Sequence, residues 1–103
     1  MIKYGDDRVT NLQFAAFYPR IERRDEQWVD VELRFETKPN TDEVPSDLIE
    51  LTALVICTRA GAPIQIEAQD AGCDCEYQFT FFEKEQIEAF VRSDEIQEAI
   101  RRA

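Results

Sequence analysis

The sequence predicts an α+β protein: an antiparallel sheet of about five strands in a meander, followed by one or two C-terminal helices. Apolar and polar residues alternate with a period of two in several segments between residues 9 and 82, which is the pattern of half-buried strands. Short turns with glycine separate the later segments, so neighbouring strands should pair antiparallel. After residue 82 the apolar spacing changes to i, i+3, i+4, which indicates helix. At 103 residues the chain predicts a single domain, 1–103.

The N-terminal third predicts two strands. We expect the first over residues 9–18, with Phe14 and Phe17 on opposite faces, and Pro19 should end it because proline has no N–H to donate. Residues 1–8 read as a loose arm or an edge, and the charged residues that follow Pro19 as a hairpin loop. Residues 28–36 are the clearest predicted strand, because from Val29 to Glu36 apolar and charged side chains alternate, which predicts a strand with one wet face.

The middle of the chain supplies most of the predicted core. Residues 38–47 hold two prolines and three acids and predict a long loop. Residues 48–58 are apolar on both faces in their middle, as expected of a central strand. A strand over 63–69, a tight turn at 70–72 and an aromatic strand over 75–82 complete the predicted sheet.

Two short helices are expected at the C-terminal end. Thr80 and Glu83 have the spacing of a capping box at the start of the first. Ser93 or Asp94 can cap the second. The apolar stripes are Ile87, Phe90 and Val91, then Ile96, Ala99 and Ile100.

The charge balance restricts the choice of partners. Formal net charge is −10, from 22 acidic and 12 basic residues. Such a field repels nucleic acid phosphates and anionic lipid and favours basic protein partners, although acidity also serves solubility alone. The N-terminal residues do not resemble a signal peptide, and no apolar run approaches the roughly 20 residues that span a bilayer. We therefore expect a cytoplasmic protein without membrane or direct nucleic acid contact.

The sequence carries no recognisable catalytic signature. It has no histidine, which removes the commonest general base, and no glycine-rich phosphate-binding motif. Cys73 and Cys75 point the same way in a strand, but a closed zinc site needs four ligands. We interpret all three thiols as reduced, with Cys57 and Cys75 as small core residues and Cys73 in a turn. We expect no enzyme, no metal and no cofactor.

Two sets of residues are candidates for protein binding. Phe17, Trp28 and Phe82 fall outside the main core pattern; unless the C-terminal helices cover them, they form an apolar patch for self-association or for extended chains. Acids on outward strand positions form a spread of negative charge that is either an ordinary wet face or a mimic of nucleic acid phosphates. These acids are Asp30, Glu32, Glu36, Glu50, Glu67 and Glu76.

Residues 28–82 resemble the SecB family of export chaperones. The similar features are an alternating strand (VDVELRF), a gap, a long apolar strand (LIELTALVICT), a turn with glycine, a strand (PIQIEAQ), and glycine leading into an aromatic strand (GCDCEYQFTF). That family is acidic and cytosolic and builds tetramers whose apolar grooves hold unfolded chains. Its long C-terminal helix has no counterpart here, because only some twenty residues follow Phe82.

The resemblance implies a non-enzymatic protein-binding module, a holdase or adaptor that uses apolar groups beside the sheet. Phe17, Trp28 and Phe82 are the expected contacts, and a homo-oligomer fits the same apolar surface. The alternative is an acidic inhibitor, of the anti-defence or immunity kind, whose six outward acids block a basic nucleic-acid-binding protein.

Overall fold

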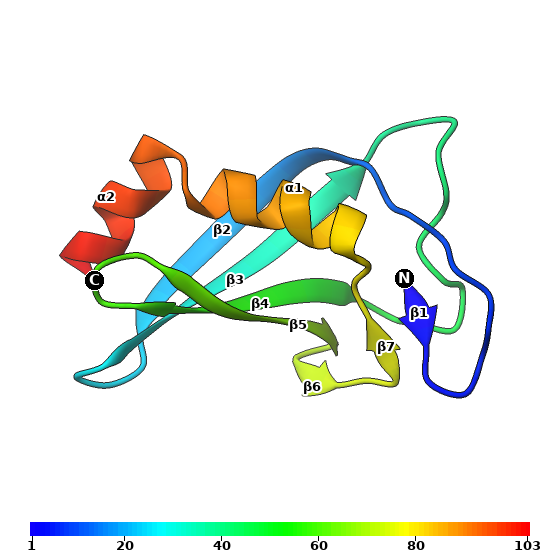
Figure 1. Ribbon diagram of the computed structural model, residues 1–103, viewed down its shortest axis with the longest axis horizontal. Helices are drawn as coiled ribbons and strands as arrows, with labels where there is room; N and C mark the ends of the chain where they lie inside the picture. Colours follow the sequence, from blue (N-terminus) through cyan, green and yellow to red (C-terminus); the bar gives the residue numbers. More distant parts are fainter.

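A computed structural model describes all 103 residues and confirms the α+β class (Figure 1). Five strands form an antiparallel meander in the order β2-β3-β4-β5-β6, and β1 and β7 form a separate two-stranded sheet. The elements in chain order are β1 (Ile2–Lys3), β2 (Phe14–Arg23), β3 (Trp28–Thr37), β4 (Leu51–Thr58), β5 (Pro63–Asp70), β6 (Cys73–Asp74), β7 (Tyr77–Gln78), α1 (Phe81–Val91) and α2 (Asp94–Arg102). Neither helix is long and apolar enough to span a bilayer.

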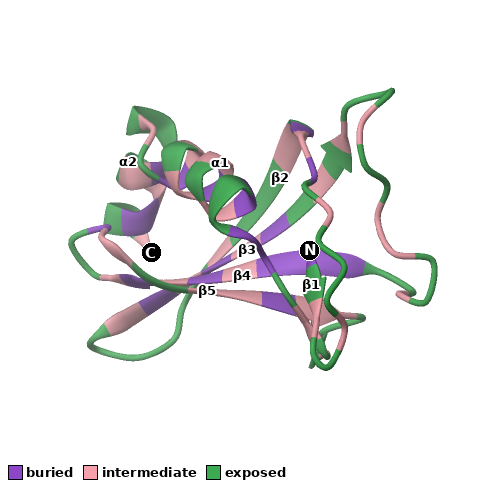
Figure 2. Cartoon of the chain, turned by 45° about the vertical axis from the view of Figure 1, so that its right-hand side comes forward, coloured by how far each residue is buried: buried purple, intermediate pink, exposed green.

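Both helices lie on one face of the large sheet, and the core fills the space between the two layers (Figure 2). Alternate residues of β3 and β4 face this core, among them Val31 and Val55, which are fully buried. The helices contribute the predicted stripes, including the fully buried Ile87 and Ile100. The opposite face of the sheet carries no helix, so its residues are only partly covered.

The expected first strand was misplaced. It runs from Phe14 to Arg23 and continues through Pro19, which pairs with Leu33 of β3. Proline is tolerated because β2 is an edge strand with neighbours on one side only. An irregularity between Phe14 and Ala16 shifts the β2–β3 register. The rings of Phe14 and Phe17 therefore lie together, with centroids 5.0 Å apart. The prediction that these two side chains lie on opposite faces was wrong.

Both ends of the predicted sheet are more precisely defined in the structure. Of the two expectations for residues 1–8, a loose arm or an edge, the second holds: Met1 is buried, and β1 pairs with β7 in a two-stranded sheet. The aromatic strand expected over residues 75–82 is reduced to the two-residue β7, because the capping box starts α1 at Phe81. The predicted central strands, the long loop and the final helix are where the sequence placed them, within a few residues.

Candidate protein-binding edge of the sheet

The outer edge of β5 has no partner strand over most of its length. Strand β5 pairs with β4 from Pro63 to Asp70 with a register irregularity at Ile64, but it pairs with β6 only at Gln69 and Asp70. The backbone carbonyl of Ala68 accepts a hydrogen bond from Cys75 Sγ at 3.5 Å, so it points away from β4. Backbone groups alternate in direction along a strand, and the N–H and C=O of Ile66 therefore also face outward. This edge offers a template for an added strand.

Apolar side chains are exposed beside this edge. The exposed fraction of Ile64 on β5 is 59%, and that of Phe81, the first residue of α1, is 77%. Between them runs a groove of about 330 Å³. Its lining residues are Pro63, Ile64, Gln65, Ile66, Phe81, Lys84, Glu85 and Glu88. We name this surface the β5 edge groove.

Glu83 holds the start of α1, and with it Phe81, in a fixed position. Thr80 Oγ1 accepts a hydrogen bond from the Glu83 N–H at 3.2 Å, and Glu83 Oε1 accepts one from the Thr80 N–H at 2.7 Å, which completes the predicted capping box. The fully buried carboxylate also accepts from the Leu12 N–H at 2.8 Å and from the Met1 ammonium at 2.7 and 2.8 Å. Three backbone segments thus meet at one carboxylate.

A second side chain of α1 strengthens this attachment. Gln86 Oε1 accepts from the Phe14 N–H at 3.0 Å, while its Nε2 donates to the Leu12 carbonyl at 2.8 Å. The amide side chain satisfies backbone groups at the irregular start of β2 and in the segment just before it. The first turns of α1 are therefore attached to the N-terminal segment by side-chain hydrogen bonds, and these bonds fix the position from which the exposed ring of Phe81 projects.

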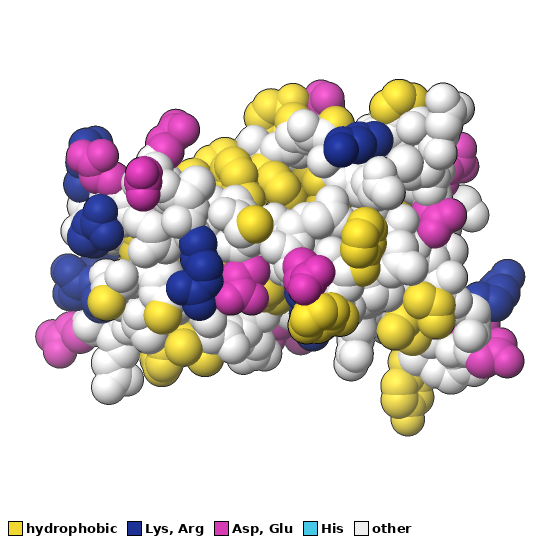
Figure 3. All heavy atoms as spheres, turned by 45° about the horizontal axis from the view of Figure 1, so that its top comes forward, with side chains coloured by type: hydrophobic (Ala, Val, Ile, Leu, Met, Phe, Trp, Pro, Cys, Tyr) yellow, Lys and Arg dark blue, Asp and Glu magenta, His cyan; other side chains and the backbone are white.

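The charges around the groove are mostly acidic. Glu85 and Glu88 line it from α1, and Glu67 lines the adjoining hollow along the same edge. Lys84 lines both hollows and forms no ion pair within the chain. Figure 3 shows hydrophobic side chains reaching the helical side at several separate places, while charged groups gather toward the end that carries α2.

The three apolar residues singled out in the sequence do not form one surface. Phe17 is half-buried and stacks on Phe90 with ring centroids 4.8 Å apart, on the helical side. Trp28 is half-buried on β3, where its parity with Asp30 places it on the opposite face. Phe82 is 42% exposed beside a shallow polar hollow.

The sequence analysis did not identify Ile64 and Phe81 as candidate contacts, although a capping box at Thr80 already implied that Phe81 begins a helix.

The outward acids share the uncovered face with arginines. Arg24 Nε lies 2.9 Å from Asp30 Oδ1, and Arg34 Nε lies 3.8 Å from Glu50 Oε1. In the β2–β3 register Arg20 stands opposite Glu32. The face is therefore of mixed sign.

The remaining three acids are dispersed. Glu36 accepts a hydrogen bond from the Tyr18 hydroxyl at 3.0 Å, which raises the pKa of that hydroxyl. Glu67 is half-buried on β5, and Glu76 is exposed between β6 and β7. No continuous row of unpaired acids crosses the sheet.

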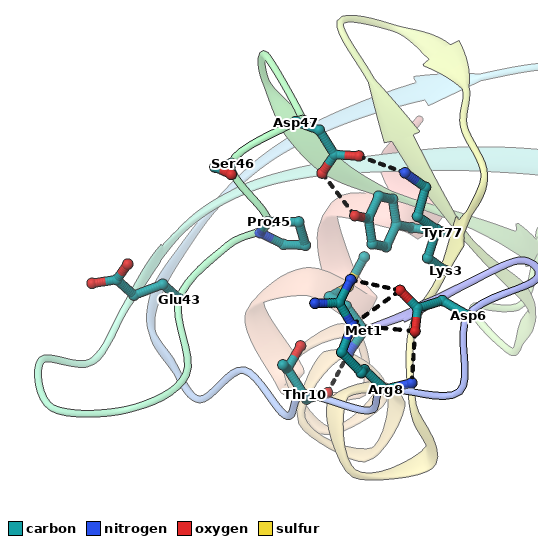
Figure 4. Close-up of a pocket in the computed structure, with 10 residues that line it drawn as sticks. All are labelled: Met1, Lys3, Asp6, Arg8, Thr10, Glu43, Pro45, Ser46, Asp47 and Tyr77. Atoms are coloured by element: carbon teal, nitrogen blue, oxygen red, sulfur yellow. Dashed lines mark hydrogen bonds and ion pairs between the residues drawn. The ribbon is translucent and has the colours of Figure 1, made fainter.

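A polar pocket of about 260 Å³ lies where the N-terminal segment meets the long loop (Figure 4). Lys3 Nζ and the Tyr77 hydroxyl both donate to Asp47, at 2.9 and 2.7 Å, and these bonds lower the pKa of that carboxyl, with Tyr77 the larger cause. Arg8 Nε donates to Oδ1 of Asp6 at 3.2 Å and Arg8 Nη2 donates to Oδ2 at 2.7 Å, and these bonds lower the pKa of Asp6 to about 2. The two bonds to Asp47 thus clamp the long loop to β1 and β7.

The cysteines are separated in environment. Cys57 is buried, and burial raises its thiol pKa to about 11. Cys73 is exposed and Cys75 is half-buried. No group of three metal-ligating side chains gathers anywhere in the structure.

Comparisons of the chain with protein-family models, with curated proteins and with solved structures find no match. The functional argument therefore depends on the β5 edge groove itself.

Proposed function

We propose that this chain is a non-enzymatic protein-binding module, a holdase or adaptor that takes an extended polypeptide segment along the β5 edge. The observation that carries the proposal is the unpaired backbone of β5 next to the exposed Ile64 and Phe81. An added strand would gain main-chain hydrogen bonds from the edge, and its alternate side chains would contact the apolar groove.

The contrast between the two edges of the sheet supports this choice. The β2 edge is interrupted by the irregularity after Phe14 and by Pro19, and then carries Arg20, Glu22 and Arg23. Proline, bulges and charge are the devices by which proteins prevent strands from adding to an edge. The β5 edge has fewer of these devices: Pro63 begins the strand, a register irregularity falls at Ile64, and Glu67 is the one charged residue before β6 pairs at Gln69. It is the edge at which strand addition meets least resistance.

The acidic lining favours segments that bring basic residues. Glu67, Glu85 and Glu88 flank the edge, and Lys84 is the single cation among the lining residues. Apolar contacts and backbone bonds would supply most of the affinity, so binding should survive high salt, with basic segments preferred at low salt.

The alternative, an acidic inhibitor that mimics nucleic acid, has less support. Its six acids lie among arginines, and Asp30 and Glu50 are each in an ion pair. A phosphate mimic requires a continuous run of negative charge. If the Glu32→Gln and Glu67→Gln double variant lost a stoichiometric basic partner at low salt, the inhibitor function would replace the one proposed here.

The proposal is tested by fluorescence anisotropy with a labelled, carboxamidomethylated basic polypeptide that cannot fold. We expect Phe81→Ser to weaken its binding about fivefold, since part of an aromatic side chain's burial is lost. Folding should be unaffected because Phe81 is largely exposed. Tyr4→Ser is the matched control, because Tyr4 is an aromatic residue with an exposed fraction of 88% outside the groove. Equal affinity for the wild-type chain and Phe81→Ser would refute the proposal.

A further inference from the structure

We infer that the β5 edge groove selects a polypeptide segment by residue order: an apolar side chain followed, two residues later, by a lysine or arginine. The inference rests on the proposed function, since the ligand is an extended polypeptide at the same edge. It adds the direction in which that segment runs, and it assigns the basic side chain of the segment to Glu85.

Glu85 is the acid of the groove that is free to bind a cation. It is exposed, lines the groove from α1 and forms no ion pair within the chain. Glu88, on the same wall, accepts a hydrogen bond from Arg92 Nε at 3.0 Å. On β5, Glu67 accepts one from the Gln65 side chain. In a chain of net charge −10, a basic side chain of the ligand is therefore attracted to Glu85 without displacing an internal partner.

The helix geometry of α1 sets the spacing between the two contacts. Phe81 and Glu85 both line the groove and are four residues apart, so they lie on the same face of the helix, about 6 Å apart along its axis. In an extended segment, side chains two residues apart point to the same face and are about 6.6 Å apart. An apolar side chain that contacts Phe81 therefore brings the side chain two residues further on to Glu85.

The order of the two contacts follows from the directions of α1 and β5. Figure 1 shows that α1, from its start at Phe81, runs opposite to β5. A segment that adds to β5 antiparallel therefore runs in the same direction as α1 and meets Phe81 before Glu85. Antiparallel pairing is the slightly more stable kind, and here it uses the outward N–H and C=O of Ile66, beyond the register irregularity at Ile64. The apolar residue thus comes first and the basic residue second.

Lys84 makes the reversed order unfavourable. It lies between Phe81 and Glu85 in α1, lines the groove and forms no ion pair within the chain. A segment with its basic residue first would bring that cation to the Phe81 end, beside the Lys84 ammonium. Its apolar side chain would then meet the Glu85 carboxylate. The groove therefore discriminates by a repulsive contact as well as by an attractive one.

Two short peptides of identical composition test the order. Both are labelled, blocked at their ends and built from serine and threonine, apart from one leucine and one lysine that are separated by one residue. Fluorescence anisotropy at low salt should show that the peptide with leucine first binds about fivefold more tightly than the peptide with lysine first. The two peptides carry the same charge and the same apolar side chain, so only the order can cause the difference.

Charge reversal at Glu85 tests the assigned contact. Glu85→Lys should remove the preference for the leucine-first peptide and should favour, about fivefold, a leucine-first peptide with glutamate in place of lysine. Glu85 is exposed, so the variant should fold. Glu95→Lys is the matched control and should keep the wild-type preference, because Glu95 is an exposed residue of α2 that has no ion pair and lies outside the groove.

The outcomes separate this inference from the proposed function. Equal affinity for the two orders, a preference that survives Glu85→Lys, or failure of both peptides to bind would overturn the inference. If the unfolded basic polypeptide still bound, and Phe81→Ser still weakened its binding, the proposed function would stand. If the unfolded polypeptide did not bind at all, the proposed function would fall and the inference with it.

Discussion

Replacing Glu83 with glutamine should destabilise the fold more than any surface change. The carboxylate is fully buried and receives the Met1 ammonium together with the N–H groups of Leu12 and Thr80. In the Glu83→Gln variant the ammonium loses its counter-charge, and one amide N–H₂ group faces donors. Removing one partner of a buried ion pair costs about 3–5 kcal/mol, against a total stability of about 5–15 kcal/mol for a domain of this size.

The cost is measurable by urea unfolding followed by circular dichroism and by Trp28 fluorescence. Thermal unfolding gives a second measure: since 1 kcal/mol shifts the melting temperature of a domain of about 100 residues by roughly 4–8 °C, a loss of about 3–5 kcal/mol should lower the melting temperature by about 12 °C or more. Glu85→Gln on the exposed side of the same helix is the matched control and should change stability by less than about 0.5 kcal/mol. A loss below about 1 kcal/mol for Glu83→Gln would refute the role assigned to this carboxylate.

Three further predictions concern the turn at Gly61, the cysteine thiols and the Asp6–Arg8 ion pair. Gly61→Ala should lower the free energy of unfolding by about 2 kcal/mol, measured in urea, because φ of Gly61 is +100° and a Cβ there would overlap the Gln97 side chain. Gly72→Ala is the control: φ is +81° but the space around it is open, so the loss should be smaller. Equal losses for the two variants would contradict the packing argument. Iodoacetamide at neutral pH should modify the exposed Cys73 in the folded protein and Cys57 only after unfolding, because Cys57 is buried and its thiol pKa is about 11. Mass spectrometry of the labelled peptides measures both, and modification of Cys57 in the folded protein would contradict its burial. The hydrogen bonds from Arg8 depress the pKa of Asp6 from 3.8 to about 2, so this ion pair stabilises the fold above pH 3.8 and is lost as the pH falls through about 2. The Arg8 amide resonance should therefore titrate near pH 2, and a midpoint near 3.8 would show that the Asp6–Arg8 pair is absent.

The parts of the fold that the sequence predicted are those with strong local patterns. In β3 the alternation of Val29, Val31 and Leu33 with charged residues settles both the strand and its buried face. The capping box at Thr80 and Glu83 likewise fixed the start of α1. Each of these signals acts within a few residues, so long-range contacts do not have to be known.

The errors arose where long-range structure overrides a local pattern. A proline ends a strand only where that strand is paired on both sides, and no local sequence feature shows that β2, which contains Pro19, lies at the edge of the sheet. Tyr77, Phe79 and Phe81 alternate as in a strand, yet Phe81 belongs to the helix that the capping box starts. The buried Met1 depends on Glu83, which lies far along the chain.

The candidate site was out of reach for the same reason. Phe17 and Phe82 were chosen because they fell outside a simple alternation, but exposure depends on which elements cover them. The β5 edge groove exists because β6 pairs at only two positions and leaves Ile66 facing outward. Local sequence encodes the strand, while the order of strands in the sheet decides which one is at the edge.

Amide hydrogen exchange of Ile66 tests the central claim most directly. In the free protein the outward N–H of Ile66 should exchange rapidly, while the neighbouring Gln65 N–H, directed toward β4, stays protected. Adding the unfolded basic polypeptide should slow exchange at Ile66 and leave Gln65 as it was. Binding of the polypeptide with no change at Ile66 would place the binding surface elsewhere and contradict the account.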